Sequence, residues 1–362
     1  MATFWLNAGA LVACSLPYDK LAEKPKTEST QVQIGIGSGV DNTGGSVPHV
    51  ALWDQGGNRI GQSYGDANGH WDSGTLNEID VEHKQNGGKK AQPEYLQVVA
   101  WEGDGICISM VSVTSNGAQW GWTGDMAKMC GGDWFPSTYM LGDGTDTPSC
   151  IWIDSDHTNG IRAQGFSLHM PDFAQRDGRK MALEDTPETN CKSGPRQTFW
   201  YDRLPDQQPD FFKPPLKYTP DGGDVDTKRV VTRKADLYPF PPRPRHKRDI
   251  MKRSANLKEG HIVISDFPAH SAKEVCEHPT SLGWDFVSTV EGIYCDITAR
   301  EWWPLCSDKV KTGCFDLDKR EMRGNAPGHK GSQRRDLLTG REISDKKYQT
   351  EDTWHFKPKP GH

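Results

Sequence analysis

The sequence has no surplus of positive charge and no long apolar run. It contains 43 Lys and Arg against 49 Asp and Glu, a formal net charge of −6. No excess of cations is left to neutralise phosphates, so the chain as a whole is not expected to bind nucleic acid. No run approaches the ~18 apolar residues that a transmembrane helix needs, and no membrane span is predicted. The sequence lacks H-E-x-x-H, Walker-type and C-x-x-C patterns. These absences exclude the corresponding metalloprotease, nucleotide and zinc sites, and no cofactor is predicted.

The composition is poor in apolar residues and rich in turn formers. Only 34% of the 362 residues are hydrophobic, whereas 38 are Gly and 24 are Pro. A chain of this length allows two domains with linkers. A helical bundle is excluded by the Gly and Pro content, and we expect a mainly β protein with many turns.

Short β-type runs alternate with Gly, Asn and Asp turns from residue 31 to about residue 173. Seven or more short strands without a long helical period predict an antiparallel β-sandwich or jelly roll, placed at residues 31–200. Seven tryptophans lie between Trp53 and Trp152. We expect them to pack in the core of this module, the alternative being exposed faces for sugar stacking.

The amino-acid composition changes towards the C-terminus. Residues 201–257 are Pro-rich and predict an extended linker. Residues 258–318 predict a small module that needs disulfides, because so short a segment buries little apolar surface. The charged tail, residues 319–362, is expected to be disordered.

The cysteines fall into two sets of four once Cys14 is set aside, with more than eighty residues between the sets. An even number in each part predicts two modules with their own disulfides, in three possible pairings each. The alternative is buried free thiols in a cytosolic protein. The two sets are Cys107, Cys130, Cys150 and Cys191, and Cys276, Cys295, Cys306 and Cys314.

Two segments indicate a secretory route and an extracellular location. Residues 1–20 resemble a signal peptide, with an uncharged run from Phe4 to Leu16 but no Lys or Arg ahead of it. The alternative is a bacterial lipobox ending at Cys14. In the linker, two Lys-Arg pairs predict cleavage by a kexin-like protease after Arg248 or Arg253. The other interpretations of this basic run are a nuclear-localisation or nucleic-acid patch and a solvated loop.

One motif suggests catalysis. Glu78, Asp80 and Glu82 alternate with Ile79 and Val81, so a strand would place the three carboxylates on one face. The run resembles the E-x-D-x-E signature of glycoside hydrolase family 16. This resemblance implies that Glu78 is the nucleophile, Asp80 an assisting residue and Glu82 the general acid/base. The same alternation is typical of an edge strand with one wet face.

Two oxygen-rich segments could hold Ca²⁺, although neither has EF-hand spacing. One contains Asp66, Asn68 and Asp72, the candidate metal ligands, and the other runs from Asp154 to Gly160. Asx turns explain both without a metal. We interpret His157 and His169 as structural or surface residues.

The whole chain resembles uncharacterised secreted proteins of filamentous fungi. The likeness rests on the segments Trp152–Gly160, His270–Cys276, Gly292–Asp296 and Trp303–Cys306, joined by the dibasic Pro-rich linker. It implies a location and an architecture but no activity. The sequence therefore favours a secreted, non-catalytic binding or effector-like protein acting at a cell wall, glycan or host surface. The alternative is a β-glucan-active glycoside hydrolase or transglycosylase that uses Glu78 and Glu82.

Overall fold

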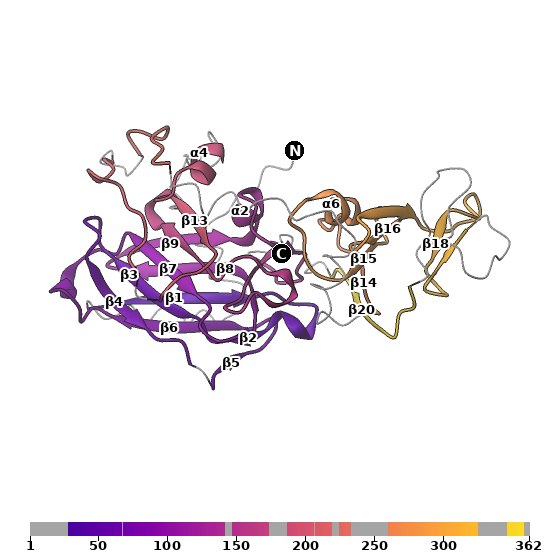
Figure 1. Ribbon diagram of the computed structural model, residues 1–362, viewed down its shortest axis with the longest axis horizontal. Coiled ribbons are helices and arrows are strands. Elements are labelled where there is room, and N and C mark those ends of the chain that lie inside the picture. The colour runs from indigo at the N-terminus through magenta and orange to yellow at the C-terminus, as the bar shows by residue number, and fades with distance from the viewer. Residues whose placement is uncertain are drawn as a thin grey trace. The chain divides into compact units, whose positions relative to one another are not determined.

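The fold is taken from a computed structural model that describes residues 28–66, 68–141, 147–173, 187–205, 207–218, 224–232, 260–324 and 346–357. The chain divides into two compact units, residues 1–241 with 359–362 and residues 242–358. Both units consist mainly of β-strands, as predicted (Figure 1).

The first sheet of the N-terminal unit has six antiparallel strands. Its long central strand, β8 (Ile106–Ser115), pairs with β1 on one side and with both β11 and β9 on the other. Within the part of the chain that the structure describes, strand β6 pairs with β1 alone and forms an edge of the sheet. The remaining strands are β1 (Ser29–Ile36), β6 (Leu76–Glu82), β9 (Ala118–Thr123), β10 (Trp134–Phe135) and β11 (Cys150–Ile153).

The second sheet has five strands, and it faces the first across the core. The two sheets meet where the Trp122 ring of β9 stacks on the Phe166 ring of β12, with centroids 4.7 Å apart. Inward residues such as Val32 and Ile34 are buried and alternate with outward polar ones, the period-two pattern of a sandwich. The strands, in sheet order, are β13 (Gln197–Trp200), β12 (Gly165–His169), β7 (Tyr95–Val99), β3 (His49–Trp53) and β4 (Arg59–Ser63).

The other elements of this unit are short. The helices are η1 (Asp41–Thr43), η2 (Gly88–Lys90), α2 (Gly124–Met129), η3 (Thr158–Gly160), η4 (Met170–Phe173) and α4 (Pro187–Lys192), and β2 (Gly45–Ser46) pairs with β5 (His70–Trp71). Among the described residues, no helix is both long and apolar enough to cross a membrane. Two disulfides link Cys107 to Cys150 and Cys130 to Cys191.

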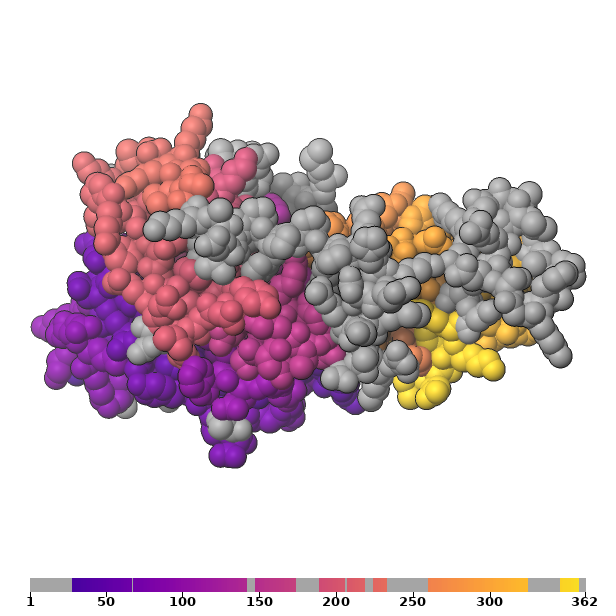
Figure 2. Space-filling model, viewed as in Figure 1, coloured from indigo at the N-terminus to yellow at the C-terminus, as the bar shows by residue number. Residues whose placement is uncertain are grey.

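A segment predicted to be part of the linker packs on the sandwich instead. We call residues 201–205, 207–218 and 224–232 the strap; its salmon-coloured atoms run over this unit in Figure 2. Phe212 is buried, and its backbone N–H donates to the Tyr95 hydroxyl over 3.1 Å. The outer face of the second sheet carries Trp53 and Tyr95, and Phe211 of the strap packs against them. Proline content alone could not reveal this cover, which depends on a distant surface. Residues 233–257 of the predicted linker lie outside the described residues.

An ionic network fixes the strap. The buried Arg196 guanidinium donates to Asp172 over 2.7 Å and to Asp224 of the strap over 2.8 Å. His169 Nδ1 lies 3.0 Å from the Asp172 carboxylate, and His169 Nε2 lies 3.3 Å from the Tyr218 hydroxyl. Burial disfavours the charged imidazole, but Asp172 and Glu94 outweigh that effect and raise the pKa of His169. His169 is therefore a structural residue, in agreement with its interpretation from the sequence.

The C-terminal unit is a five-stranded mixed sheet. Strand β14 (His261–Ser265) pairs in parallel with both β15 and β20, whereas β15, β16 and β17 pair antiparallel. The strands flanking it are β15 (Asp285–Ser288), β16 (Ile293–Asp296), β17 (Glu301–Pro304) and β20 (Thr350–Trp354), and β18 (Cys314–Asp316) pairs with β19 (Glu321–Arg323).

Strands β19 and β20 correct the prediction of a disordered tail for the part of residues 319–362 that the structure describes. Charged residues dominate this region, so the composition conceals both strands. The buried Trp354 anchors β20 beside β14, where it contacts Phe286 with ring centroids 5.6 Å apart.

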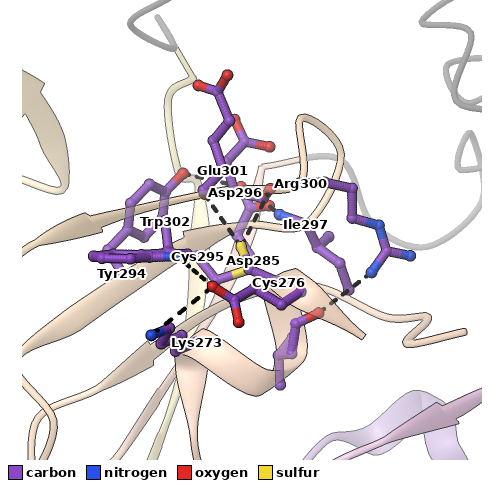
Figure 3. The surroundings of a disulfide bond; sticks show 12 residues. Lys273, Cys276, Asp285, Tyr294, Cys295, Asp296, Ile297, Arg300, Glu301 and Trp302 are labelled. Carbon is purple, nitrogen blue, oxygen red and sulfur yellow. Dashed lines mark hydrogen bonds and ion pairs between the residues drawn. A yellow bond between two sulfur atoms is a disulfide. The ribbon is translucent and has the colours of Figure 1, made fainter. Parts of the chain in front are cut away.

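Two disulfides staple this unit, Cys276–Cys295 and Cys306–Cys314, so all four bonds lie within the two predicted sets. Cys276 lies on α6 (Ala272–Glu277), whose N-cap Ser271 accepts from the Glu274 N–H over 3.0 Å. Figure 3 shows that the Cys276–Cys295 disulfide ties α6 to β16, next to Tyr294 and Asp296.

Candidate functional site: the loop end of the sandwich

Several loops of the N-terminal unit meet at one end of the sandwich. Antiparallel pairing brings together the end of β11 and the start of β8, where Ile153 lies opposite Ile106. In the second sheet Gly165 is paired with Val99 on one side and with Trp200 on the other. The loops next to these three residues therefore leave the sheet at the same end of its strands. We call this the loop end; it comprises residues 37–44, 64–66, 68–75, 100–105, 154–164 and 201–202. Loops at one end of a rigid sandwich are a common place for binding residues.

Exposed aromatic side chains distinguish the loop end from the rest of the unit. Trp101 is 48% exposed and Tyr201 is 44% exposed, whereas Trp53, Trp120 and Trp122 are buried. The prediction that tryptophans fill the core is thus confirmed for those three and for the buried Trp134 and Trp152, whereas Trp101 is exposed and Trp71 is half-buried. Tyr64, at the same end, is 72% exposed. Large apolar surfaces left in water call for a functional explanation when they gather in one place.

Gln164 holds the Trp101 and Tyr201 loops in a fixed relation. Its backbone accepts from Ala100 and donates to Trp200, both over 2.8 Å, so it lies between the residues that precede the two aromatics. Its side chain donates to the Ala100 carbonyl over 3.2 Å and accepts from the Arg203 N–H. Two strand spacings separate the two loops, which places their backbones roughly 10 Å apart.

The ring of His157 packs against the ring of Tyr201. The two rings are stacked with centroids 4.0 Å apart and planes at 14°. One ring nitrogen of His157 lies 3.2 Å from the Ile161 carbonyl, and the other lies 3.5 Å from Asp202. His157 and Asn159 both have φ of 57°, an uncommon conformation for residues other than glycine. The ring of Tyr201 is thereby held in place while remaining partly exposed.

A pair of carboxyl groups shapes the same loop. Asp154 is buried and accepts from the Thr158 hydroxyl over 2.7 Å, while Asp156 accepts from the Thr158 N–H over 3.1 Å. Burial raises the pKa of Asp154 to about 6, and the neighbouring Asp156 adds to that effect. Gly103 approaches so closely that a Cβ there would lie 2.7 Å from Asp156. These contacts are turn chemistry and explain the oxygen-rich pattern of the sequence without a metal.

The other oxygen-rich segment is also a turn. The Asn68 N–H donates to the Asp66 carboxylate over 2.9 Å, the hydrogen bond of an Asx turn. Asp72 lies 3.7 Å from His70, whose other ring nitrogen lies 3.3 Å from Asp104. Within the described residues, no three His, Cys, Asp or Glu side chains gather in a metal-binding arrangement.

The carboxylate row Glu78, Asp80 and Glu82 lies on the exposed face of edge strand β6, whereas Val81 points into the core. Gln33 donates to Glu78 over 3.1 Å, and Lys84 forms an ion pair with Glu82. A glycosidase pair needs carboxyl groups converging in a cleft, about 5 Å apart for the retaining reaction. The exposed row has the character of an edge strand with one wet face.

Arg248 and Arg253, the expected processing positions, lie outside the described residues, as does the signal-like segment 1–20. Processing and secretion therefore stay predictions.

Sequence reasoning missed the joint placement of Trp101, His157 and Tyr201. They are far apart in the chain, and only the pairing of β7, β12 and β13 brings their loops together. The one signal present was that Trp101 is the last residue of a predicted strand, residues 95–101, and precedes the turn sequence Glu102–Gly105.

Comparison with known proteins gives little information. No family model and no curated protein matches the chain. Three solved structures of LOX deletion variants show a likeness with 8–9% sequence identity and a TM-score of 0.20. The alignment spans 34% of this chain and 16% of the LOX chain. A likeness at this level supports no argument about fold or function.

Proposed function

We propose that the chain is a secreted, non-catalytic binding protein, and that its loop end binds a glycan of a cell wall or host surface. The observation that carries the proposal is the exposure of Trp101 and Tyr201 on fixed loops, in a unit that buries Trp53, Trp120 and Trp122. A pyranose presents C–H groups that stack on aromatic rings and hydroxyls that donate to acceptors. Flexible loops would lose entropy on binding, and the Gln164 and His157 contacts reduce that cost.

Acceptor groups surround the two rings. Asp156 and Asp202 are exposed beside His157 and Tyr201, and Glu102 and Asp104 follow Trp101 directly. Ionised carboxylates only accept hydrogen bonds, which suits the many hydroxyl donors of a sugar. Four disulfides are consistent with an oxidising compartment, where cell-wall and surface glycans occur.

Binding to β-1,3 and β-1,3/1,4 glucans, measured by calorimetry or affinity electrophoresis with the full chain, tests the proposal. Trp101→Ala and Tyr201→Ala should each weaken binding about tenfold or more, because each removes one stacking face. Val290→Ala, a matched loss of an exposed apolar side chain in the other unit, should leave affinity unchanged. Equal affinity of all three variants would refute the loop-end assignment.

The alternative glycoside hydrolase is tested with the same glucans. Turnover by the wild type that disappears in Glu78→Gln would replace our proposal with the enzyme. Binding without turnover supports the proposal.

A further inference from the structure

Three ionisable side chains are enclosed together in the C-terminal unit. The Lys346 Nζ lies 2.9 Å and 2.8 Å from the two carboxyl oxygens of Asp285, and 2.6 Å from Asp296 Oδ1. Both carboxyl groups are buried, and Lys346 is mostly covered. Lys346 belongs to the tail, whereas Asp285 and Asp296 belong to β15 and β16. A segment 61 residues distant in the chain thus brings an amine against a buried acid.

The proton count of this cluster favours one protonated carboxyl group. With all three ionised, the cluster would carry a net charge of −1 in a buried site, which is costly. Burial raises the pKa of Asp285, and the neighbouring charge of Asp296 adds to the effect, so Asp285 takes up the compensating proton. The same two aspartates raise the pKa of Lys346, so the amine is held as an ammonium until it gives up a proton. Transfer of one Lys346 proton across 2.6 Å to Asp296 then leaves an amine, two acids and no charge.

The surroundings of Asp285 are those of an activated carbonyl. Tyr348 donates to Asp285 Oδ2, the Tyr294 hydroxyl lies 3.4 Å from the same oxygen, and the Ile297 N–H donates to Oδ1 over 3.0 Å. Burial raises the pKa of both tyrosines, so both remain proton donors. Preorganised donors aimed at a carbonyl oxygen stabilise the negative charge that develops there during nucleophilic attack.

The amine lies next to the carbon that it would attack. Its hydrogen-bond distances of 2.9 Å and 2.8 Å to the two Asp285 oxygens keep the nitrogen roughly 3–3.5 Å from the carboxyl carbon, so attack requires a rotation that brings the nitrogen above the carboxyl plane. The Cys276–Cys295 bond holds β16, and with it Tyr294 and Asp296, against α6 (Figure 3). Such a site fixes the reacting groups before reaction, as intramolecular acyl transfer requires.

We propose that Lys346 and Asp285 become joined by an intramolecular amide bond, with Asp296 as the proton-transferring residue. The Lys346 Nζ gives one proton to Asp296 and attacks Cγ of protonated Asp285, forming the C–N bond. Asp296 returns that proton to the departing hydroxyl and receives the second amine proton, and the C–O bond breaks. One water leaves, the amide keeps one N–H, and Asp296 ends protonated. No oxidant, metal or external energy source enters the reaction.

The intact mass of the purified full chain, measured after reduction and denaturation, tests the proposal. The expected mass is lower than that of the reduced chain by one water, and a protease digest should contain a branched peptide that joins the Asp285 and Lys346 segments. Lys347→Arg, at the exposed neighbouring lysine, should retain the water loss.

Two variants separate the reaction from other causes of water loss. Lys346→Arg keeps a positive charge against the carboxylates but cannot form this amide, so it should show the full mass. Asp296→Asn keeps the shape and removes the proton acceptor, so it should accumulate unlinked chain. The disulfide map and circular dichroism of each variant show that it has folded. A full mass for the wild type, or a water loss that persists in Lys346→Arg, would overturn the proposal.

Discussion

Arg196 is the residue on which the strap depends most, and Arg196→Met tests that dependence. The guanidinium is fully buried and contacts Asp172, Asp224, the Asp226 carbonyl at 3.0 Å and the Arg229 carbonyl at 3.3 Å. Methionine fills a similar volume without the charge. The substitution leaves two buried carboxylates, of which Asp172 keeps His169 as a partner.

Removing one partner of a buried ion pair destabilises a protein by about 3–5 kcal/mol. If that free energy is lost from strap docking, the equilibrium between open and docked strap shifts by about 100-fold to a few thousand-fold. The change should be local, because the disulfides and sandwich core do not depend on this contact.

Hydrogen exchange followed by mass spectrometry measures the effect where it occurs. The Val225 N–H donates to the Lys217 carbonyl over 2.9 Å, and the Gly194 N–H donates to the Val231 carbonyl over 3.1 Å. Both amides should exchange faster in Arg196→Met, while β8 amides stay protected. Lys228→Met, which removes an exposed cation from the same segment, is the matched control. Unchanged exchange at Val225 and Gly194 would show that apolar contacts of Phe212 and Leu216 hold the strap without the ionic network.

Two further predictions concern individual carboxyl groups. Because burial raises the pKa of Asp154 to about 6, the stabilisation from its protonated form is present at low pH and is lost as pH rises through 6. Asp154→Asn should therefore raise the free energy of unfolding at pH 7 by about 1–3 kcal/mol and flatten its dependence between pH 4 and 7. Thermal unfolding across that pH range measures this; a steeper dependence in the variant would contradict it. Glu78→Gln and Glu82→Gln should each change stability by less than about 0.5 kcal/mol, because both side chains are hydrated on an edge strand. A thermal-shift loss equivalent to 2 kcal/mol or more would show that the row is structurally engaged.

The fold class was predictable because its determinants are local. Alternating residues such as Val32, Gln33 and Ile34 indicate a strand with one buried face, and the sequence spacing of the cysteines indicates two stapled modules. The wet face of β6 was among the alternatives that the alternation of Glu78 and Val81 left open. None of these inferences needs knowledge of which strands are neighbours.

The strap, strand β20 and the aromatic site were not predictable, because each depends on partners far away in the chain. Phe212 is buried only because the second sheet offers an aromatic outer face. Lys346 lies in a charged sequence and acquires its role from two aspartates on other strands. Tyr201 becomes part of a site through His157. The composition of each of these segments predicts exposure to solvent, and tertiary packing overrides that local preference.

The parallel pairing of β14 with β20 determines how the C-terminal unit would respond to mechanical load. In a parallel pair the start of one strand and the end of the other lie at opposite ends of the ladder. A pull on the chain before Gly260 and after Trp354 would therefore slide the two strands along each other, loading all of their backbone hydrogen bonds at once. An antiparallel pair pulled at its adjacent ends would instead open one bond at a time. The pairing of β14 with β20 is thus suited to resist tension along the strands.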